Sequence, residues 1–112
     1  MAIKNKEVSE FTSHFANECK QRKYMLKRYE QIKNRKYLSS EESAELELLE
    51  KRINNLDKMM NRISDPSVRG IITNLWIDKM SKAKVARMHN VSESEVYYAV
   101  NRACKKLYQS LD

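Results

Sequence analysis

The chain has 112 residues, a formal net charge of +7 and 41% hydrophobic residues, which suits one domain with a modest core. One glycine and one proline are too few to punctuate a multi-strand sheet, so the sequence predicts an all-α fold. It has neither a signal-peptide core nor an apolar stretch that could span a bilayer, and its two cysteines, Cys19 and Cys104, are too few for a disulfide framework. We therefore expect a soluble, cytoplasmic protein with free thiols.

Charge is distributed unevenly along the chain. Residues 1–38 carry ten Lys and Arg against four acidic residues, residues 39–64 carry four against six, and residues 65–112 carry eight against five. A basic chain is typical of nucleic-acid binders, because neutralising phosphates releases counterions. A Lys-rich helical surface that is merely solvated has the same composition, so charge alone leaves both interpretations open.

A long first helix is predicted over residues 7–37. Its apolar residues alternate irregularly between the a and the d or e positions of a coiled-coil heptad, and Arg22 interrupts this seam. These positions are Val8, Phe11, Phe15, Cys19, Met25, Leu26, Tyr29 and Ile32. The many cations between them either contact a nucleic-acid backbone, remain solvated, or face the acidic helix that follows.

The second predicted helix, residues 40–63, has the most regular pattern in the chain. Ser39 and Glu42 are spaced as a capping box at its start. An a/d seam then follows, formed by Leu46, Leu49, Ile53, Leu56, Met60 and Ile63. The short break before this helix predicts an antiparallel hairpin with the first helix.

The same seam also predicts a homodimer. It is more apolar than one imperfect partner helix is expected to cover, and Leu48 and Met59 widen it further. We therefore assign the six seam residues to a dimer interface, two-fold dimers being the commonest soluble oligomers. Whether the seam packs within one chain, between two chains, or both remains open at this point.

A third helix is predicted over residues 66–79. Asp65 suits the N-cap, and Pro66 suits the first helical position, where its missing N–H is not needed. Trp76 is expected to anchor the core beneath the helices that follow. Gly70 lowers helix propensity by about 1 kcal/mol, which a close approach of another element would justify.

The last third of the chain has the pattern of a helix-turn-helix unit, with helices predicted over residues 82–89 and 92–110. Asn90 stands where the turn needs a left-handed residue, and Ser92 with Glu95 forms a second capping box. The second of these helices has an apolar face at helical spacing, consisting of Val96, Val100, Ala103, Leu107 and Leu111.

We find no constellation typical of catalysis or metal binding. His14 and Cys19 are five residues apart and do not converge on a helix, and His89 and Cys104 lack metal-ligand spacing. No Gly-rich phosphate loop is present. The sequence therefore predicts a protein that is not an enzyme and has no cofactor and no metal.

Residues 63–107, from Ile63-Ser-Asp-Pro through Trp76 to the helix-turn-helix, resemble region 4 of bacterial sigma factors, and most of all the sigma-like domains of phage regulators of the RinA and ArpU type. We therefore divide the chain into the predicted helical hairpin over residues 1–63, for dimerisation or partner contact, and a DNA-binding domain over residues 64–112, which the resemblance implies. Its last helix would enter the major groove of double-stranded DNA. The nucleic-acid-binding residues implied by position are Ser94, Tyr97, Tyr98, Asn101, Arg102 and Lys105 on that helix, with Lys82, Lys84 and Arg87 near phosphates.

The sequence departs from that pattern at His89, where an aliphatic residue is usual and a half-buried packing role is expected, and at Asn90, which replaces glycine. Glu93 and Glu95 also stand on the first turn of the reading helix, where they favour the helix dipole but would repel phosphate.

Three hypotheses follow. The first is a phage-encoded, DNA-binding transcription regulator, with RNA polymerase or another host protein as a further partner. The second is a sigma-like protein-interaction module, acting as an inhibitor or assembly factor without sequence-specific DNA binding. Exposed tyrosines at positions 97, 98 and 108 would suit such a protein interface. The third is a packaging factor similar to a terminase small subunit, which would bind DNA as a ring.

Overall fold

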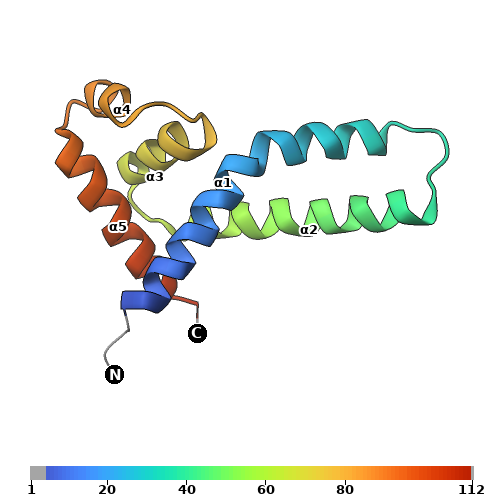
Figure 1. Ribbon diagram of the computed structural model, residues 1–112, viewed down its shortest axis with the longest axis horizontal. Coiled ribbons are helices and arrows are strands. Elements are labelled where there is room, and N and C mark those ends of the chain that lie inside the picture. Colours follow the sequence, from blue (N-terminus) through green and yellow to red (C-terminus); the bar gives the residue numbers. More distant parts are fainter. Residues whose placement is uncertain (1–4, 112) are drawn as a thin grey trace.

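The structure is a computed structural model that describes residues 5–111, and every regular element in that range is helical (Figure 1). The elements are α1 (Asn5–Lys33), α2 (Ser40–Arg62), α3 (Pro66–Ile72), η1 (Thr73–Ile77), α4 (Lys82–Met88) and α5 (Glu93–Gln109). The predicted all-α fold is confirmed.

Two predicted boundaries are wrong. The first helix ends at Lys33 rather than at Tyr37, because its last buried side chain is Ile32 and the residues beyond it are exposed. Tyr37 is accordingly 81% exposed. The third helix changes character after Ile72, where η1 continues it as a π-helix.

The local start signals of the helices are largely confirmed. The Ser39 hydroxyl accepts a hydrogen bond from the N–H of Glu42, whose carboxylate accepts one from the N–H of Ser39, so both halves of this capping box are present. The Asp65 carboxylate caps α3 by accepting from the N–H of Ser67 at 2.9 Å. At Ser92, only the bond from the N–H of Glu95 forms among the described residues.

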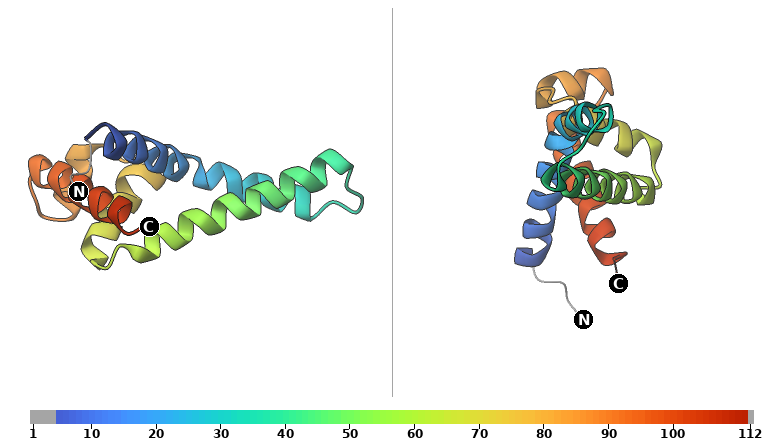
Figure 2. Two further views of the ribbon diagram at one scale, coloured as in Figure 1. Left: turned by 90° about the horizontal axis from the view of Figure 1, so that it is seen from below. Right: turned by 90° about the vertical axis from the view of Figure 1, so that its right-hand side faces the viewer.

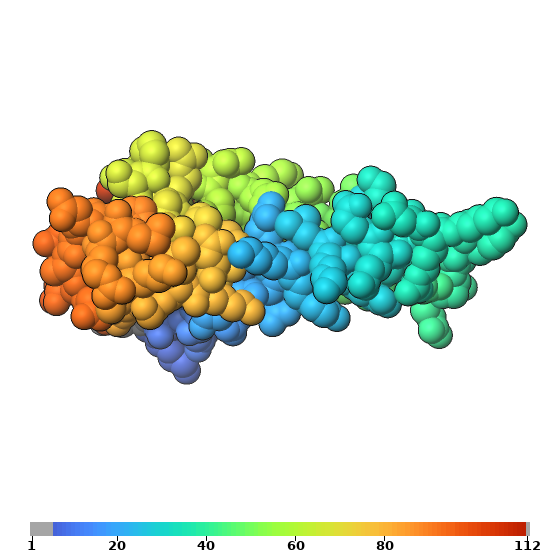
Figure 3. Space-filling model, turned by 90° about the horizontal axis from the view of Figure 1, so that it is seen from above, coloured from blue at the N-terminus to red at the C-terminus, as the bar shows by residue number. Residues whose placement is uncertain are grey.

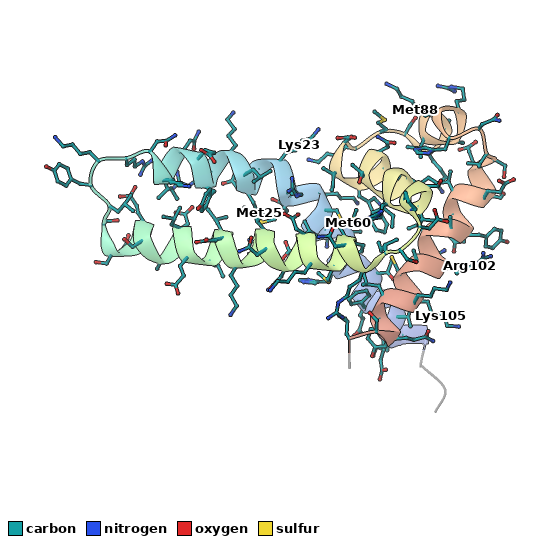
Figure 4. The ribbon with its side chains drawn as sticks, turned by 180° about the vertical axis from the view of Figure 1, so that it is seen from behind. Lys23, Met25, Met60, Met88, Arg102 and Lys105 are labelled. Carbon is teal, nitrogen blue, oxygen red and sulfur yellow. The ribbon has the colours of Figure 1, made fainter. Side chains whose placement is uncertain are left out.

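The helices α1 and α2 form the predicted antiparallel hairpin, which projects from the rest of the molecule as an arm (Figures 1 and 3). Met25 of α1 is buried against α2 (Figure 4). On α2 the buried seam residues are Leu49, Ile53, Leu56 and Ile63, while Leu46 and Met60 are half-buried. The seam therefore packs within one chain. α1 covers most of the seam but leaves Leu48 exposed, and the homodimer itself stays an untested prediction.

Arginine–carboxylate pairs tie the two helices of the hairpin together on its flanks. Each guanidinium donates two hydrogen bonds to one carboxylate, a geometry that fixes register as well as adding energy. The pairs are Arg22 with Asp57, Arg28 with Glu45, and Arg52 with Glu18. Arg22 and Arg28 thus face the acidic helix, which was one of the open interpretations of the basic run.

The first half of α1 leaves the hairpin and packs against the C-terminal helices (Figures 1 and 2). The Phe15 ring meets Trp76 of η1 edge-on at 5.9 Å, so Trp76 anchors α1 rather than only the helix-turn-helix. The Phe11 ring lies 5.5 Å from Tyr108. One core therefore crosses the predicted division at residues 63 and 64, although the separate functions assigned to the two halves stay predictions.

Candidate nucleic-acid interface

The helices α4 and α5 are joined by the short turn that the sequence predicts. Asn90 adopts a left-handed conformation, with φ of 55°, which confirms the prediction for this position. The N–H of Val91 donates to the carbonyl of Ala86 at 3.0 Å and closes the turn. Val85 and Ala86 are buried, so α4 is held firmly across α5.

A chain of polar contacts fixes this turn to the rest of the molecule. The amide Nδ2 of Asn74 donates to Asp78 at 3.0 Å, which leaves its Oδ1 to accept from Nε2 of His89 at 2.8 Å. The Lys23 ammonium lies 3.0 Å from Asp78 and, with the Asn74 amide, holds the pKa of that carboxyl below its usual range. His89 is half-buried as predicted, and its ring also covers Gly70.

The buried face of α5 differs from the predicted one at two positions. Val96, Val100, Cys104 and Leu107 are buried, whereas Ala103 is half-buried and Leu111 is 44% exposed. Cys104 rather than Ala103 is buried because α1 covers that side of α5. Leu111 lies beyond the end of the helix.

Burial also sets the chemistry of the two cysteines. It raises the pKa of the Cys19 thiol to about 12, with a smaller contribution from the neighbouring Cys104, whose own pKa rises to about 11. Both thiols are free, as the sequence predicts.

The opposite face of α5 points away from the molecule and carries most of the side chains assigned to DNA reading. Tyr97 and Tyr98 are 55% and 62% exposed, and their rings meet edge-on at 5.6 Å. Arg102 and Lys105 are exposed on the following turns (Figure 4). The remaining members of the set are Ser94, which is exposed, and Asn101, which is half-buried.

The cations of α4 lie beside this face. Lys82 places its Nζ 5.7 Å from the centre of the Tyr97 ring, so α4 and α5 form one continuous surface there. Lys84 and Arg87 are also exposed, but no hydrogen bond, ion pair or ring contact in the described part of the chain joins them to α5. The surface also contains Glu93, which lines a shallow hollow with Lys82, Ser94 and the two tyrosines.

A second depression lies on the other flank of α5 and was missed by the sequence analysis. It is a cleft of about 230 Å³ between α5 and the segment that joins α2 to α3. Its walls come from residues roughly forty positions apart in the chain, such as Arg62 and Arg102. No local sequence pattern brings such segments together.

Within residues 5–111, no three His, Cys, Asp or Glu side chains gather closely enough to hold a metal ion. In that range, too, every helix is too short or too polar to cross a membrane.

The fold thus defines an all-α protein in which a helical hairpin is packed onto a helix-turn-helix unit. The chain belongs to the family described as Protein of unknown function (DUF1492), whose family model matches residues 37–108. The match begins in the turn before α2 and ends within α5, so it includes the whole helix-turn-helix. No curated protein and no solved structure matched the chain.

Proposed function

We propose that this protein is a DNA-binding transcription regulator, phage-encoded, that reads the major groove with α5. The proposal rests on the side chains of the outer face of α5. It presents tyrosine and arginine side chains outward, with the half-buried Asn101 beside them, while the opposite face is buried and holds the helix in place. Asn and Arg are the side chains that pair bidentately with adenine and guanine in that groove.

The charges around α5 support the same function. Lys82, Lys84 and Arg87 on the preceding helix form no ion pair within residues 5–111, so they are available to phosphates on either side of the groove. Such contacts position a reading helix without specifying sequence. The net charge of +7 adds long-range attraction to any nucleic acid.

The alternative is a protein-interaction module that binds a host protein, such as RNA polymerase, without sequence-specific DNA binding. Glu93 and Glu95 favour it, because both are exposed on the first turn of α5, where a reading helix approaches base edges. Of the three tyrosines assigned to such an interface, only Tyr97 and Tyr98 are available. Tyr108 is half-buried and donates its hydroxyl to Glu7 at 3.0 Å, which corrects its description as an exposed tyrosine.

The decisive experiment is a gel shift with fragments of the surrounding genome and with a random duplex, each at two salt concentrations. A regulator would retain one fragment over the random duplex at the higher salt, because base contacts depend less on salt than phosphate contacts do. Failure to bind any duplex even at low salt would favour the hypothesis of a protein-interaction module. If light scattering instead showed the mass of a large oligomer on bound DNA, the packaging factor would be favoured.

A further inference from the structure

The cleft between α5 and the α2–α3 connection combines an apolar floor with a basic rim. The floor is formed by Val68, Ala103 and the buried Leu107. The rim carries Arg62 at the end of α2 and Arg102 and Lys106 on α5, against one carboxylate, Asp65. That carboxylate also accepts the N–H of Ser67, and the three cations against one anion leave the cleft predominantly cationic.

The cations of the rim are only partly engaged by their own chain. Arg62 donates from Nη1 to the carbonyl of Ser110 at 3.0 Å, whereas the side chains of Arg102 and Lys106 make no hydrogen bond or ion pair in the described part of the chain. At about 230 Å³, the cleft is smaller than the roughly 300–1,000 Å³ typical of small-molecule sites. It suits one or two side chains of a protein.

The outer face of α2 presents one carboxylate and one apolar side chain that could complement this cleft. Residues 41–50 contain five glutamates, of which Glu42 pairs with Arg35 and Glu45 with Arg28. Glu41 is exposed and unpaired within the described residues, and Leu48 is 56% exposed. Glu41, Leu48, Asn55 and Arg62 follow one another at intervals of seven, so they form a nearly straight stripe facing away from α1.

We propose that a second copy of this chain docks on the stripe, with the two α2 helices antiparallel and a two-fold axis at Asn55. Leu48 and Arg62 each lie seven residues from Asn55, about 10 Å along the helix, so Leu48 of one copy meets Arg62 of the other. Glu41 lies a further seven residues along and reaches the other copy's cleft, beside Lys106 and Arg102.

Charge and burial select a second copy over other occupants. In the two-fold arrangement each copy supplies both the cationic cleft and the carboxylate that enters the other copy's cleft. It also covers Leu48, which α1 leaves exposed although the neighbouring seam is buried. The surface lies on the outer side of the hairpin from the buried seam, so this dimer requires no opening of the monomer core.

Charge exchange tests the contact by sedimentation of the full chain. Glu41→Lys and Lys106→Glu should each raise the dimer dissociation constant about tenfold or more, because each change acts twice in a two-fold dimer. Combining the two substitutions should restore dimerisation, since the introduced lysine of one copy then meets the introduced glutamate of the other. Glu50→Lys makes the same charge change on a different side of α2 and should leave the constant unchanged.

Cross-linking tests the axis itself. Asn55→Cys should link to its symmetry mate with a short bis-maleimide, whereas Glu50→Cys should not, and the native thiols are buried in both variants. Circular dichroism confirms that each variant is folded. A wild-type monomer at high micromolar concentration, an unlinked Asn55→Cys variant, or a folded charge-exchange double variant that stays monomeric would each overturn the proposal.

Discussion

Nε2 of His89 lies 2.8 Å from Oδ1 of Asn74, and this hydrogen bond joins the turn of the helix-turn-helix to the π-helix that precedes it. The bond fixes the plane of the imidazole ring over Gly70, where an added Cβ would lie 3.2 Å from Cε1 of the ring. A residue with no side chain is therefore favoured at this position of α3 because of a histidine nineteen positions later in the chain.

The first prediction concerns this close approach. Gly70→Ala should gain little or lose stability in the native background, because the ring held by Asn74 cannot move away freely. In a His89→Ala background the same change should stabilise by up to about 1 kcal/mol, the usual helix preference of alanine over glycine. Urea unfolding of the four proteins measures the coupling. Equal effects of Gly70→Ala in the two backgrounds would contradict it.

The second prediction concerns the ion pair between Arg22 and Asp57 on the flank of the hairpin. Arg22→Ala should cost about 0.5–1 kcal/mol, because it removes two hydrogen bonds, at 2.9 and 3.1 Å, to the partly exposed Asp57. The loss should shrink in high salt. Lys20→Ala, an exposed and unpaired neighbour among the described residues, is the control and should change the free energy of unfolding by almost nothing. A double-mutant cycle with Asp57→Ala that shows no coupling free energy between the two residues would contradict the prediction.

The third prediction separates base reading from charge attraction. Arg102→Ala should cost about 1–3 kcal/mol at the specific site and relax preference at one base pair. Lys84→Ala should instead weaken all sequences alike and lower the salt slope by about one unit. Fluorescence anisotropy with the selected duplex and single-base variants measures both. If the two substitutions behave identically, α5 does not read bases.

The fourth prediction uses the acidic first turn of α5. Glu93→Gln and Glu95→Gln each remove a negative charge while keeping the size of the side chain. If α5 approaches DNA, either change should tighten non-specific binding several-fold at low salt, because less phosphate repulsion remains. Unchanged, negligible DNA affinity combined with weaker binding to a host protein would favour the protein-interaction module.

The fifth prediction concerns the buried thiols at alkaline pH. Their folded pKa values, about 12 for Cys19 and about 11 for Cys104, lie above the ordinary value of 9.0. The stabilisation from a neutral buried thiol is therefore complete below pH 9.0 and is lost as pH rises toward the folded values. The limiting slope is about 1.4 kcal/mol per pH unit for each thiol. Cys104→Ala should unfold with a shallower dependence above pH 9.0; an unaltered slope would refute this.

Sequence reasoning succeeded where the cause is local. The N-caps Ser39 and Asp65 were predictable because a side chain bonds to a backbone N–H two or three residues away. The left-handed Asn90 was predictable because few residues tolerate that conformation. Helix periodicity likewise located α2 to within a residue of its observed end.

It failed where the cause lies in another part of the chain. Ala103 and Cys104 are adjacent and both suit an interior, so only the position of α1 decides which one is buried. The partner of Arg22 depends on the register of α1 against α2, which periodicity alone does not fix. The outward face of α5 was predicted correctly as a surface, and its role in binding remains to be tested.

The contact between Phe11 and Tyr108 has a consequence for the order in which this protein folds. Tyr108 also donates a hydrogen bond to Glu7 across a sequence separation of 101 residues, so the start of α1 packs against α5. On the ribosome, α1 and α2 can pair as soon as α2 emerges, whereas Phe11 can pack against Tyr108 only after α5 has emerged. The closure of so long a loop is a slow kind of step in folding, and until it occurs the nascent chain leaves Phe11 without its contact to Tyr108.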